Sequence, residues 1–304
     1  MYKRCWRKRC WLNSLLLIGG LLLVSTSWAN HFRVVATTST LGMLVEEIGG
    51  DLVQVRVLAA PDRDAHHLDA RPSFMAAVRR ADLLIEMGAG LEEGWLPAVT
   101  ANAANPRVNY GRPGHLRASD FTGLRPSITV EGPNSGHVHE EGNPHFNIDP
   151  YRMARIAQVI GRRLGFFFPD QADELEARAE ALGQQLRDHA QALAEQVKPD
   201  QQFIVYHEDL DYLEAWLPVK SVGYLEPIPG LPPTSAHLRQ LVRHFEGQQG
   251  RVLYASYQPS RGARFLEQHL GWAGFALPLD PPLGSGLQGY LDLMTQWAEA
   301  FEYQ

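Results

Sequence analysis

Cysteine is scarce in this chain, and its position removes it from most of the molecule. The 304 residues contain two cysteines, Cys5 and Cys10, and both precede an apolar run at residues 15–24. If the N-terminal segment is removed on export, the remaining chain has neither a disulfide nor a thiolate. Any metal site in that part must then use nitrogen and oxygen ligands.

Basic charge is also in short supply. The sequence has 28 Lys and Arg against 34 Asp and Glu, which gives a net charge of −6 at pH 7. Five basic residues lie within the first nine positions, so a chain without its leader would carry a net charge of about −11. Binding of nucleic acid usually requires a basic face, and we therefore exclude nucleic acid as a partner.

Long hydrophobic runs are missing as well. The apolar run at residues 15–24 is ten residues long, about half of what a membrane-spanning helix needs. Basic residues precede it, and Ser27-Trp28-Ala29 follows it with the small-x-small pattern of a cleavage site. We therefore predict a secretory signal peptide at residues 1–29 and a soluble, periplasmic chain from Asn30. An uncleaved membrane anchor is the alternative; a lipid anchor is not expected, because no cysteine lies at the cleavage point.

The chain that remains alternates between strand-like and helix-like runs, which is typical of a parallel sheet with helices on its faces. In the first half, strands are predicted at residues 32–37, 53–58, 83–87 and 108–110, and helices at 40–48, 74–81 and 92–102. After residue 199, strands are predicted at 203–206, 219–224, 252–255 and 275–279, and helices at 209–216, 236–246, 260–269 and 290–301. The pattern predicts two α/β lobes of similar plan.

A single long helix is predicted between the two lobes. From Ala172 to Val197, apolar residues recur at steps of three, four or seven, and Pro199 ends the pattern. Asp170 is the expected N-cap. Such a helix would be about 40 Å long, enough to serve as a rigid strut. The predicted units are residues 30–168 for the first lobe, 169–198 for the linking helix and 199–304 for the second lobe.

A loop that carries two histidines lies between a predicted strand and a predicted helix. Its sequence at residues 64–73 is DAHHLDARPS. It follows the carboxyl end of a strand, where ligands collect in open parallel sheets, and imidazole is the commonest transition-metal ligand in proteins. His66 and His67 are adjacent and point in different directions, so one of them is expected to enter a metal site.

Three later segments could supply further ligands. His145, His207 and Asp280 each lie in a loop or at the end of a predicted strand, in both halves of the chain. Their spacing matches no compact metal motif such as H-E-x-x-H, so an ordinary surface or hydrogen-bonding role for each residue stays open. An ordinary role is expected for the remaining histidines outside one Gly-rich loop, namely His31, His115, His189, His237, His244 and His269. The pair in that loop, His137 and His139, could collect zinc weakly or simply be solvated.

Three of these segments resemble motifs of one protein family. The loop at residues 64–73 resembles the D-P-H-x-[YF]-E-P-x-P-S loop of the cluster A-I solute-binding proteins of ABC importers, the ZnuA/TroA-like family. NPHFNIDP at residues 143–150 resembles the family's D-P-H-x-W-x-D-P, and HEDLDY at 207–212 resembles its H-D-A-F-x-Y. The resemblance covers nearly the whole chain after the leader. Ala65, Asp69 and Ala70 depart from the pattern but leave His66 in place.

The resemblance implies a ligand set and a fold. The implied metal ligands are His66, His145, His207 and Asp280. His67 corresponds to a neighbouring position that does not bind the metal. The implied fold consists of two Rossmann-like (β/α)4 lobes joined by one long rigid helix, with the metal site in the cleft between the lobes.

Three imidazoles and one carboxylate form a donor set that suits tetrahedral Zn²⁺. Mn²⁺ prefers more oxygen ligands, and manganese-binding relatives usually have a carboxylate where this chain has His207, so manganese is the second choice. Asp64 and Glu208 would be additional ligands, or acceptors that hold an imidazole in orientation.

The resemblance implies a binding protein without enzymatic activity. It would capture Zn²⁺ and deliver it to an ABC transporter permease, act as a monomer, and have a periplasmic metallochaperone as a further partner. Two alternatives remain open from the residues. One is a secreted zinc hydrolase in which water replaces Asp280 and Glu208 acts as the base. The other is a surface adhesin or sensor whose metal is structural.

Overall fold

The computed structural model describes residues 31–127, 140–228 and 230–302. His31–Gln304 form one compact unit. The predicted signal peptide, both cysteines, and the pair His137 and His139 lie outside the described residues. Among the described residues, no helix is long and apolar enough to cross a membrane.

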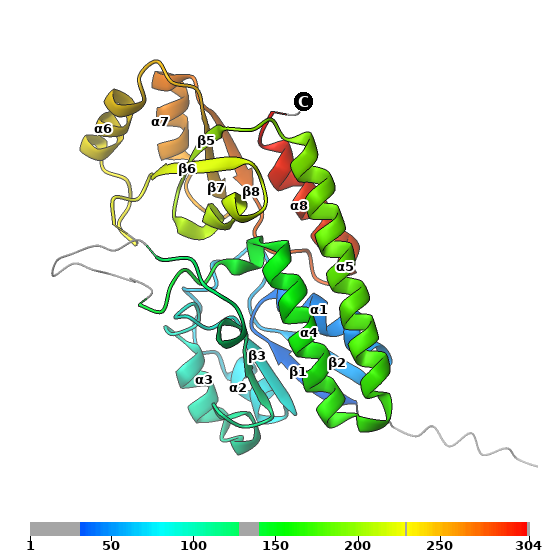
Figure 1. Cartoon of the computed structure of the whole chain (residues 1–304). Helices are drawn as coiled ribbons and strands as arrows, with labels where there is room; N and C mark the ends of the chain where they lie inside the picture. Colours follow the sequence, from blue (N-terminus) through cyan, green and yellow to red (C-terminus); the bar gives the residue numbers. More distant parts are fainter. Residues whose placement is uncertain (1–30, 128–139, 229, 303–304) are drawn as a thin grey trace, which may run out of the picture. The chain divides into compact units, whose positions relative to one another are not determined.

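The first lobe is built on a four-stranded parallel sheet with the strand order β2-β1-β3-β4 (Figure 1). Its strands are β1 (Phe32–Ala36), β2 (Val53–Val57), β3 (Leu83–Glu86) and β4 (His115–Arg117). The helices that connect them are α1 (Ser39–Gly49), α2 (Pro72–Arg79) and α3 (Leu96–Ala103). Apolar side chains of α2 and α3 form a core with β1 and β3, because Phe74 and Val99 pack in one buried cluster with Val35 and Leu84.

The second lobe repeats this plan with the strand order β6-β5-β7-β8, again all parallel. Its strands are β5 (Gln201–Val205), β6 (Val219–Tyr224), β7 (Arg251–Ala255) and β8 (Ala273–Leu277). The helices of this lobe are α6 (Ser235–Phe245), α7 (Arg261–Leu270) and α8 (Gly286–Glu299). The predicted fold class of two parallel α/β lobes is confirmed.

Two long helices lie between the two sheets in sequence. They are α4 (Pro150–Phe167) and α5 (Ala172–Gln196). The 25 residues of α5 span about 37 Å at 1.5 Å per residue. Near its start, Arg178 of α5 donates to the Ile48 carbonyl of α1, and near its end, His189 contacts the Leu291 carbonyl and Thr295 of α8. The predicted long helix is therefore present, and it contacts both lobes.

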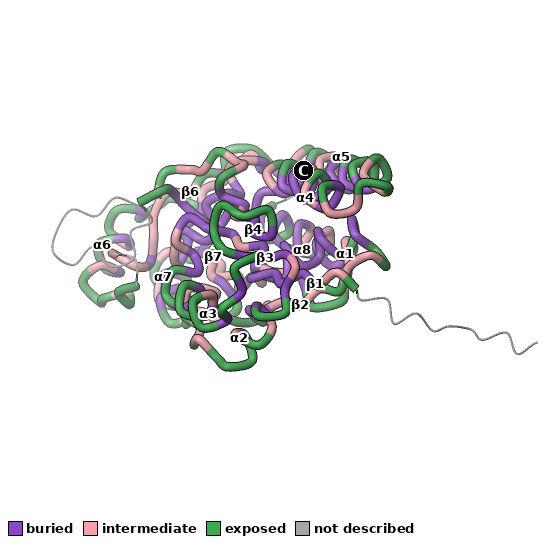
Figure 2. The backbone as a smooth tube through the Cα atoms, turned by 90° about the horizontal axis from the view of Figure 1, so that it is seen from below, coloured by how far each residue is buried: buried purple, intermediate pink, exposed green. Residues whose placement is uncertain are grey.

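One hydrophobic cluster continues through both lobes. It contains Leu83 of β3, Ile156 of α4, Leu186 of α5, Phe203 of β5 and Trp297 of α8, each buried. Figure 2 shows buried backbone concentrated at the strands and at α1 and α8, whereas α2 and α3 carry long exposed stretches. The amphipathic pattern that predicted α5 therefore corresponds to a helix that buries one face against both lobes.

The predicted strand at residues 108–110 is wrong. Residues Pro106–Val108 form a 3₁₀ turn, and the strand is β4 at His115–Arg117. The Asn105 side chain accepts from the Arg107 amide and thereby stabilises the turn. Gly114 then lets the chain pass close to the Arg107 and Asp82 carbonyls, where an added Cβ would lie 2.5 and 2.7 Å from their oxygen atoms.

Two helix predictions also need correction. The segment predicted as a helix at residues 209–216 is a 3₁₀ helix, Glu208–Ala215, because the Asp209 and Asp211 carboxylates are held by Gln258 and Tyr224 from outside the segment. Asp170 does not cap α5. It lies in a short 3₁₀ turn before α5, and the flanking residue of α5 is Gln171.

The close packing of α4 on α5 gives a test of the fold. A Cβ at Gly161 of α4 would lie 2.7 Å from Cβ of Ala179 in α5, so Gly161→Val is expected to push the helices apart and to cost about 1–3 kcal/mol of unfolding free energy. Denaturant melts measure this loss. The control is Gly123→Ala, at a glycine with nothing within 4 Å of an added Cβ; equal stability of both variants would contradict the packing.

Candidate metal site

His66 is held by its own loop. The Oδ1 atom of Asp64 accepts from the His66 backbone amide at 2.9 Å and contacts Nδ1 of its ring at 2.8 Å. The loop is tied to the first lobe by Trp95, whose indole N–H donates to the Ala65 carbonyl at 2.8 Å. Pro72 then begins α2, and it limits how the loop can enter the helix. The local sequence therefore fixes both the backbone and the ring of His66.

His145 lies on a buried turn of the first lobe that is hydrogen-bonded to the second lobe. Its backbone amide donates to Oδ1 of Asn143 at 2.9 Å, and Nδ2 of Asn143 donates to the Glu208 carbonyl in the second lobe at 2.7 Å. The hydroxyl of Tyr212 donates to the Asn143 carbonyl at 2.7 Å. The side chain of His145 is buried, and its position depends on both lobes.

His207 directly follows Val205 and Tyr206 at the carboxyl end of β5. Nδ1 of its ring lies 3.2 Å from Oε2 of Glu226, which follows β6. Burial would lower the pKa of His207, but the Glu226 carboxylate, with Asp209 and Glu208 nearby, raises this pKa to about 9. A metal that binds His207 near neutral pH therefore has to displace a proton.

The three imidazoles converge on one place. Each of His66, His145 and His207 offers a ring nitrogen, and these atoms lie within 4.8 Å of one another. The ring centroids are 4.9 Å apart for His66 and His145, 5.8 Å for His66 and His207, and 5.5 Å for His145 and His207. Because Nδ1 of His66 and of His207 each face a carboxylate, Nε2 is the atom that these two rings present to a metal.

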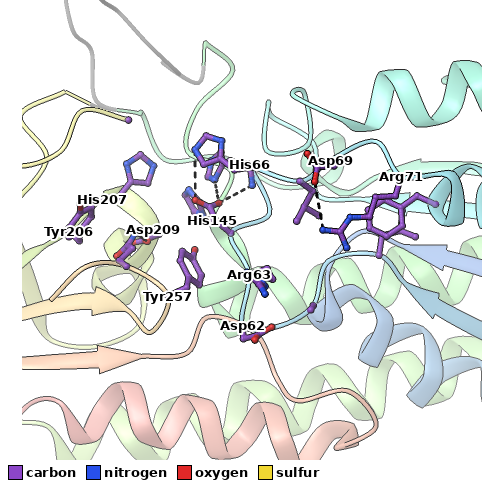
Figure 3. A pocket seen from close by; sticks show the side chains of 18 of the residues that line it. Asp62, Arg63, His66, Asp69, Arg71, His145, Tyr206, His207, Asp209 and Tyr257 are labelled. Atoms are coloured by element: carbon purple, nitrogen blue, oxygen red, sulfur yellow. Dashed lines mark hydrogen bonds and ion pairs between the residues drawn. The ribbon is translucent and has the colours of Figure 1, made fainter.

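These rings line a cavity of about 960 Å³ whose walls come from both lobes. Figure 3 shows His66, His145 and His207 on one side of it, with Asp209 and Tyr257 beside them and Asp69 and Arg71 farther along. His67 also lines the cavity, but its side chain is 60% exposed and its Nε2 atom is 4.0 Å from Oδ2 of Asp64. The structure thus assembles the three predicted histidine ligands and leaves His67 toward solvent.

Asp280 is not part of this group of three among the described residues. Its Oδ1 atom accepts from the Thr40 amide at 3.0 Å and from the Thr40 hydroxyl at 2.7 Å, at the start of α1. The next residue, Pro281, accepts from the Ser39 hydroxyl through its carbonyl at 2.8 Å. Burial raises the pKa of Asp280, and the Thr40 hydrogen bonds oppose this shift. Asp280 as a metal ligand stays a prediction.

The charges around the site favour a cation. Burial would raise the pKa of Asp64, but the His66 hydrogen bond and charge lower it to about 2, so Asp64 is ionised. Burial lowers the pKa of His66, which keeps this ring neutral and able to bind a metal. Burial raises the pKa of Asp209 to about 7, against the opposing charge of His207. These groups together can balance a divalent ion.

Several residues of the site are not singled out by the sequence, namely Asp209, Glu226, Tyr257 and Gln258. Glu226 could have been found, because it follows the predicted strand 219–224 at the same sheet edge as His207. Glu208 was considered from the sequence as a ligand or base. It is fully buried, its Oε1 atom accepts from the Ser127 hydroxyl at 2.5 Å, and it is not among the described residues that line the cavity.

Most of the other histidines have ordinary partners. His115 is buried and lies 3.1 Å from Oε1 of Glu86. His237 contacts the Tyr224 carbonyl at 2.9 Å, and His269 contacts the Phe265 carbonyl at 2.8 Å. With His189 held against α8, these four residues have the structural roles that the sequence predicted.

Fold and site together define a two-lobed parallel α/β protein with a cavity, lined by residues of both lobes, on which three imidazoles converge. Residues 34–303 match the family described as "Zinc-uptake complex component A periplasmic". The chain belongs to this family, and the resemblance noted in the sequence is confirmed.

Individual relatives agree with the family assignment. The chain is 23% identical over 312 residues to the high-affinity zinc uptake system protein ZnuA of Yersinia pestis, covering 97% of this chain and 98% of that protein. A crystal structure of ZnuA is similar with a TM-score of 0.71 and 21% identity, covering 90% and 100% of the two chains. The solute-binding protein FpvC of Pseudomonas aeruginosa, in complex with Mn²⁺, has the same fold, with a TM-score of 0.71, 17% identity and coverage of 89% and 98%.

The raised pKa of His207 predicts how zinc affinity depends on pH. Between about pH 7.5 and 8.5, apparent affinity should rise about tenfold per pH unit, because the bound metal displaces the His207 proton until pH exceeds the pKa of about 9. Glu226→Gln removes a negative charge that raises the pKa of His207. His207 then loses its proton at lower pH, and zinc affinity should level off between about pH 7.5 and 8.5. Competition titrations with a chelator measure both slopes; identical slopes would contradict the role of Glu226.

Proposed function

We propose that this protein captures Zn²⁺ in the cavity between its lobes and delivers it to the permease of an ABC transporter. The observation that carries the proposal is the convergence of His66, His145 and His207, whose ring nitrogens lie within 4.8 Å of one another. Membership of a family described as a periplasmic zinc-uptake component supports the same function. The protein binds its cargo and releases it unchanged, without catalysing a reaction.

Zinc is favoured by the chemistry of the donors. Three imidazole nitrogens suit Zn²⁺, which accepts four N and O ligands in tetrahedral geometry. Mn²⁺ is the second choice because it prefers a shell richer in oxygen. The zinc-uptake name of the Yersinia pestis relative supports this order.

The lobes support a division into a first lobe at residues 30–168, a linking helix at 169–198 and a second lobe at 199–304, after a signal peptide at 1–29. That peptide would direct export to the periplasm and be cleaved, and the protein would act there as a soluble monomer. A metallochaperone is a further proposed partner. Capture from dilute solution fits a site whose ligands come from both lobes, since binding then holds the lobes together.

The hydrolase alternative is less well supported. It requires a base within reach of a metal-bound water, and Glu208 is engaged with Ser127 instead. Zinc-dependent cleavage of model esters by the purified protein would favour a hydrolase and would contradict the transport proposal.

Removal of a ligand imidazole should abolish tight binding. His145→Ala and His207→Ala are each expected to lower zinc affinity by more than about a hundredfold, because the loss of a direct ligand costs at least as much as the loss of an outer partner. His189→Ala is the control, since His189 contacts α8 and is not among the described residues that line the cavity. Chelator competition measures all three, and equal affinities would show that the ligands are misassigned.

Zinc should also raise the thermal stability of the whole protein. At a zinc concentration about a thousandfold above Kd, selective binding to the folded state adds about 4 kcal/mol of apparent stability. Differential scanning calorimetry with and without zinc measures the shift in Tm, with Mg²⁺ as the control ion. An unchanged Tm in excess zinc would argue strongly against the site.

A further inference from the structure

His67 lines the same cavity as the three candidate ligands, but its side chain faces solvent. That side chain is 60% exposed, whereas the side chains of His66 and His207 are 11% and 12% exposed. His67 therefore offers an imidazole to an ion that has not yet reached the buried rings.

One carboxylate faces both histidines of this loop. Oδ1 of Asp64 contacts Nδ1 of His66 at 2.8 Å, and Oδ2 of Asp64 lies 4.0 Å from Nε2 of His67. The Asp64 carbonyl also accepts from the His67 backbone amide at 3.3 Å, which closes a turn over residues 64–67. The backbone thus holds the second oxygen of Asp64 and the exposed ring on the same turn.

The gap between Nε2 of His67 and Oδ2 of Asp64 suits a zinc ion. Zn²⁺ binds imidazole nitrogen and carboxylate oxygen at about 2.0–2.2 Å each, so the observed separation of 4.0 Å is within reach of two such bonds. A tetrahedral angle at zinc needs a separation of about 3.4 Å, which a small rotation of the exposed ring can provide. Two protein ligands leave the other positions to water, so an ion held there is bound weakly and reversibly.

Long-range charge does not by itself explain capture on this side of the cavity. Three basic and three acidic side chains of the first lobe line it, namely Arg56, Arg63, Arg71, Asp62, Asp64 and Asp69. Their formal charges cancel, so together they attract a distant cation only weakly. Capture on this side therefore depends on direct coordination, and imidazole is a suitable ligand for Zn²⁺.

The exposed ring is also close to the buried ones. The ring centroid of His67 is 5.9 Å from that of His66, which is 4.9 Å from that of His145. An ion held by His67 and Asp64 would lie beside the buried group with part of its water already replaced. This lowers the barrier for binding, and it lowers the barrier for release equally, because the same groups receive the ion as it leaves.

From this geometry we propose that His67 and Asp64 form a transient entry site for Zn²⁺, from which the ion passes to His66, His145 and His207. This inference rests on the proposed function, and it adds a step to capture without changing the ligands of the bound ion. A group that contacts the ion only in passing changes the rate constants of binding and release by the same factor. Kd is the ratio of these two constants, so it stays unchanged.

The test measures both rate constants in His67→Gln, whose amide is polar and similar in size but is a poor zinc ligand. Stopped-flow mixing of metal-free protein with Zn²⁺ and a chromophoric chelator gives kon, and transfer of zinc from loaded protein to excess chelator gives koff. Each should fall about tenfold, while Kd stays within about twofold of the wild-type value. The matched control is His244→Gln, at an exposed histidine of α6 that is not among the described residues that line the cavity; both its rate constants should stay at the wild-type values.

Three results would overturn the inference. Unchanged rate constants in His67→Gln would leave His67 as an ordinary exposed residue, and weaker affinity with faster release would make it a ligand of the bound ion. Equal slowing in His244→Gln would show that the effect is not specific to the cavity. Wild-type protein that takes up no zinc in the same titration would instead contradict the proposed function itself, and circular dichroism of both variants separates misfolding from a change in kinetics.

Discussion

The site depends on two hydrogen-bonded pairs, one in each lobe, that turn imidazole rings toward a shared centre. Asp64 holds Nδ1 of His66, and Glu226 holds Nδ1 of His207. Each carboxylate fixes the tautomer and leaves Nε2 to bind a metal. These partners, together with the burial of both rings, hold imidazoles from distant parts of the chain in the orientation that one shared site needs.

The two hydrogen-bonded pairs differ in how much of the tertiary structure each one requires. The Asp64–His66 pair is local, within a three-residue stretch fixed by Trp95. The Glu226–His207 pair joins the ends of two neighbouring parallel strands, so it exists only once the second sheet has formed. His145 depends on both lobes through Asn143 and Tyr212. Metal affinity is therefore a property of the folded whole.

Much of this architecture was predictable from the sequence. The amphipathic period of α5 and the alternation of strands and helices predicted both lobes. The three histidines were candidates because each follows a strand or lies in a loop, but only the family resemblance assigned them as ligands. The strand at His115–Arg117 was missed because only three residues are paired and Asn105 redirects the chain before it. Asp209 was missed because nothing in its local sequence separates it from the many surface carboxylates, whereas Glu226 had a usable signal in its position directly after the predicted strand 219–224. What distinguishes Asp209 is burial, which depends on tertiary packing.

The hydrophobic cluster that runs from β3 through α4 and α5 to Trp297 has an evolutionary consequence. The two lobes are not insulated modules, because they share buried side chains along the same helix. A substitution in the interior of either lobe shifts the frame that holds ligands contributed by the other. Divergence among such proteins should therefore proceed by compensating changes on both sides of α5, while the surface loops vary more freely.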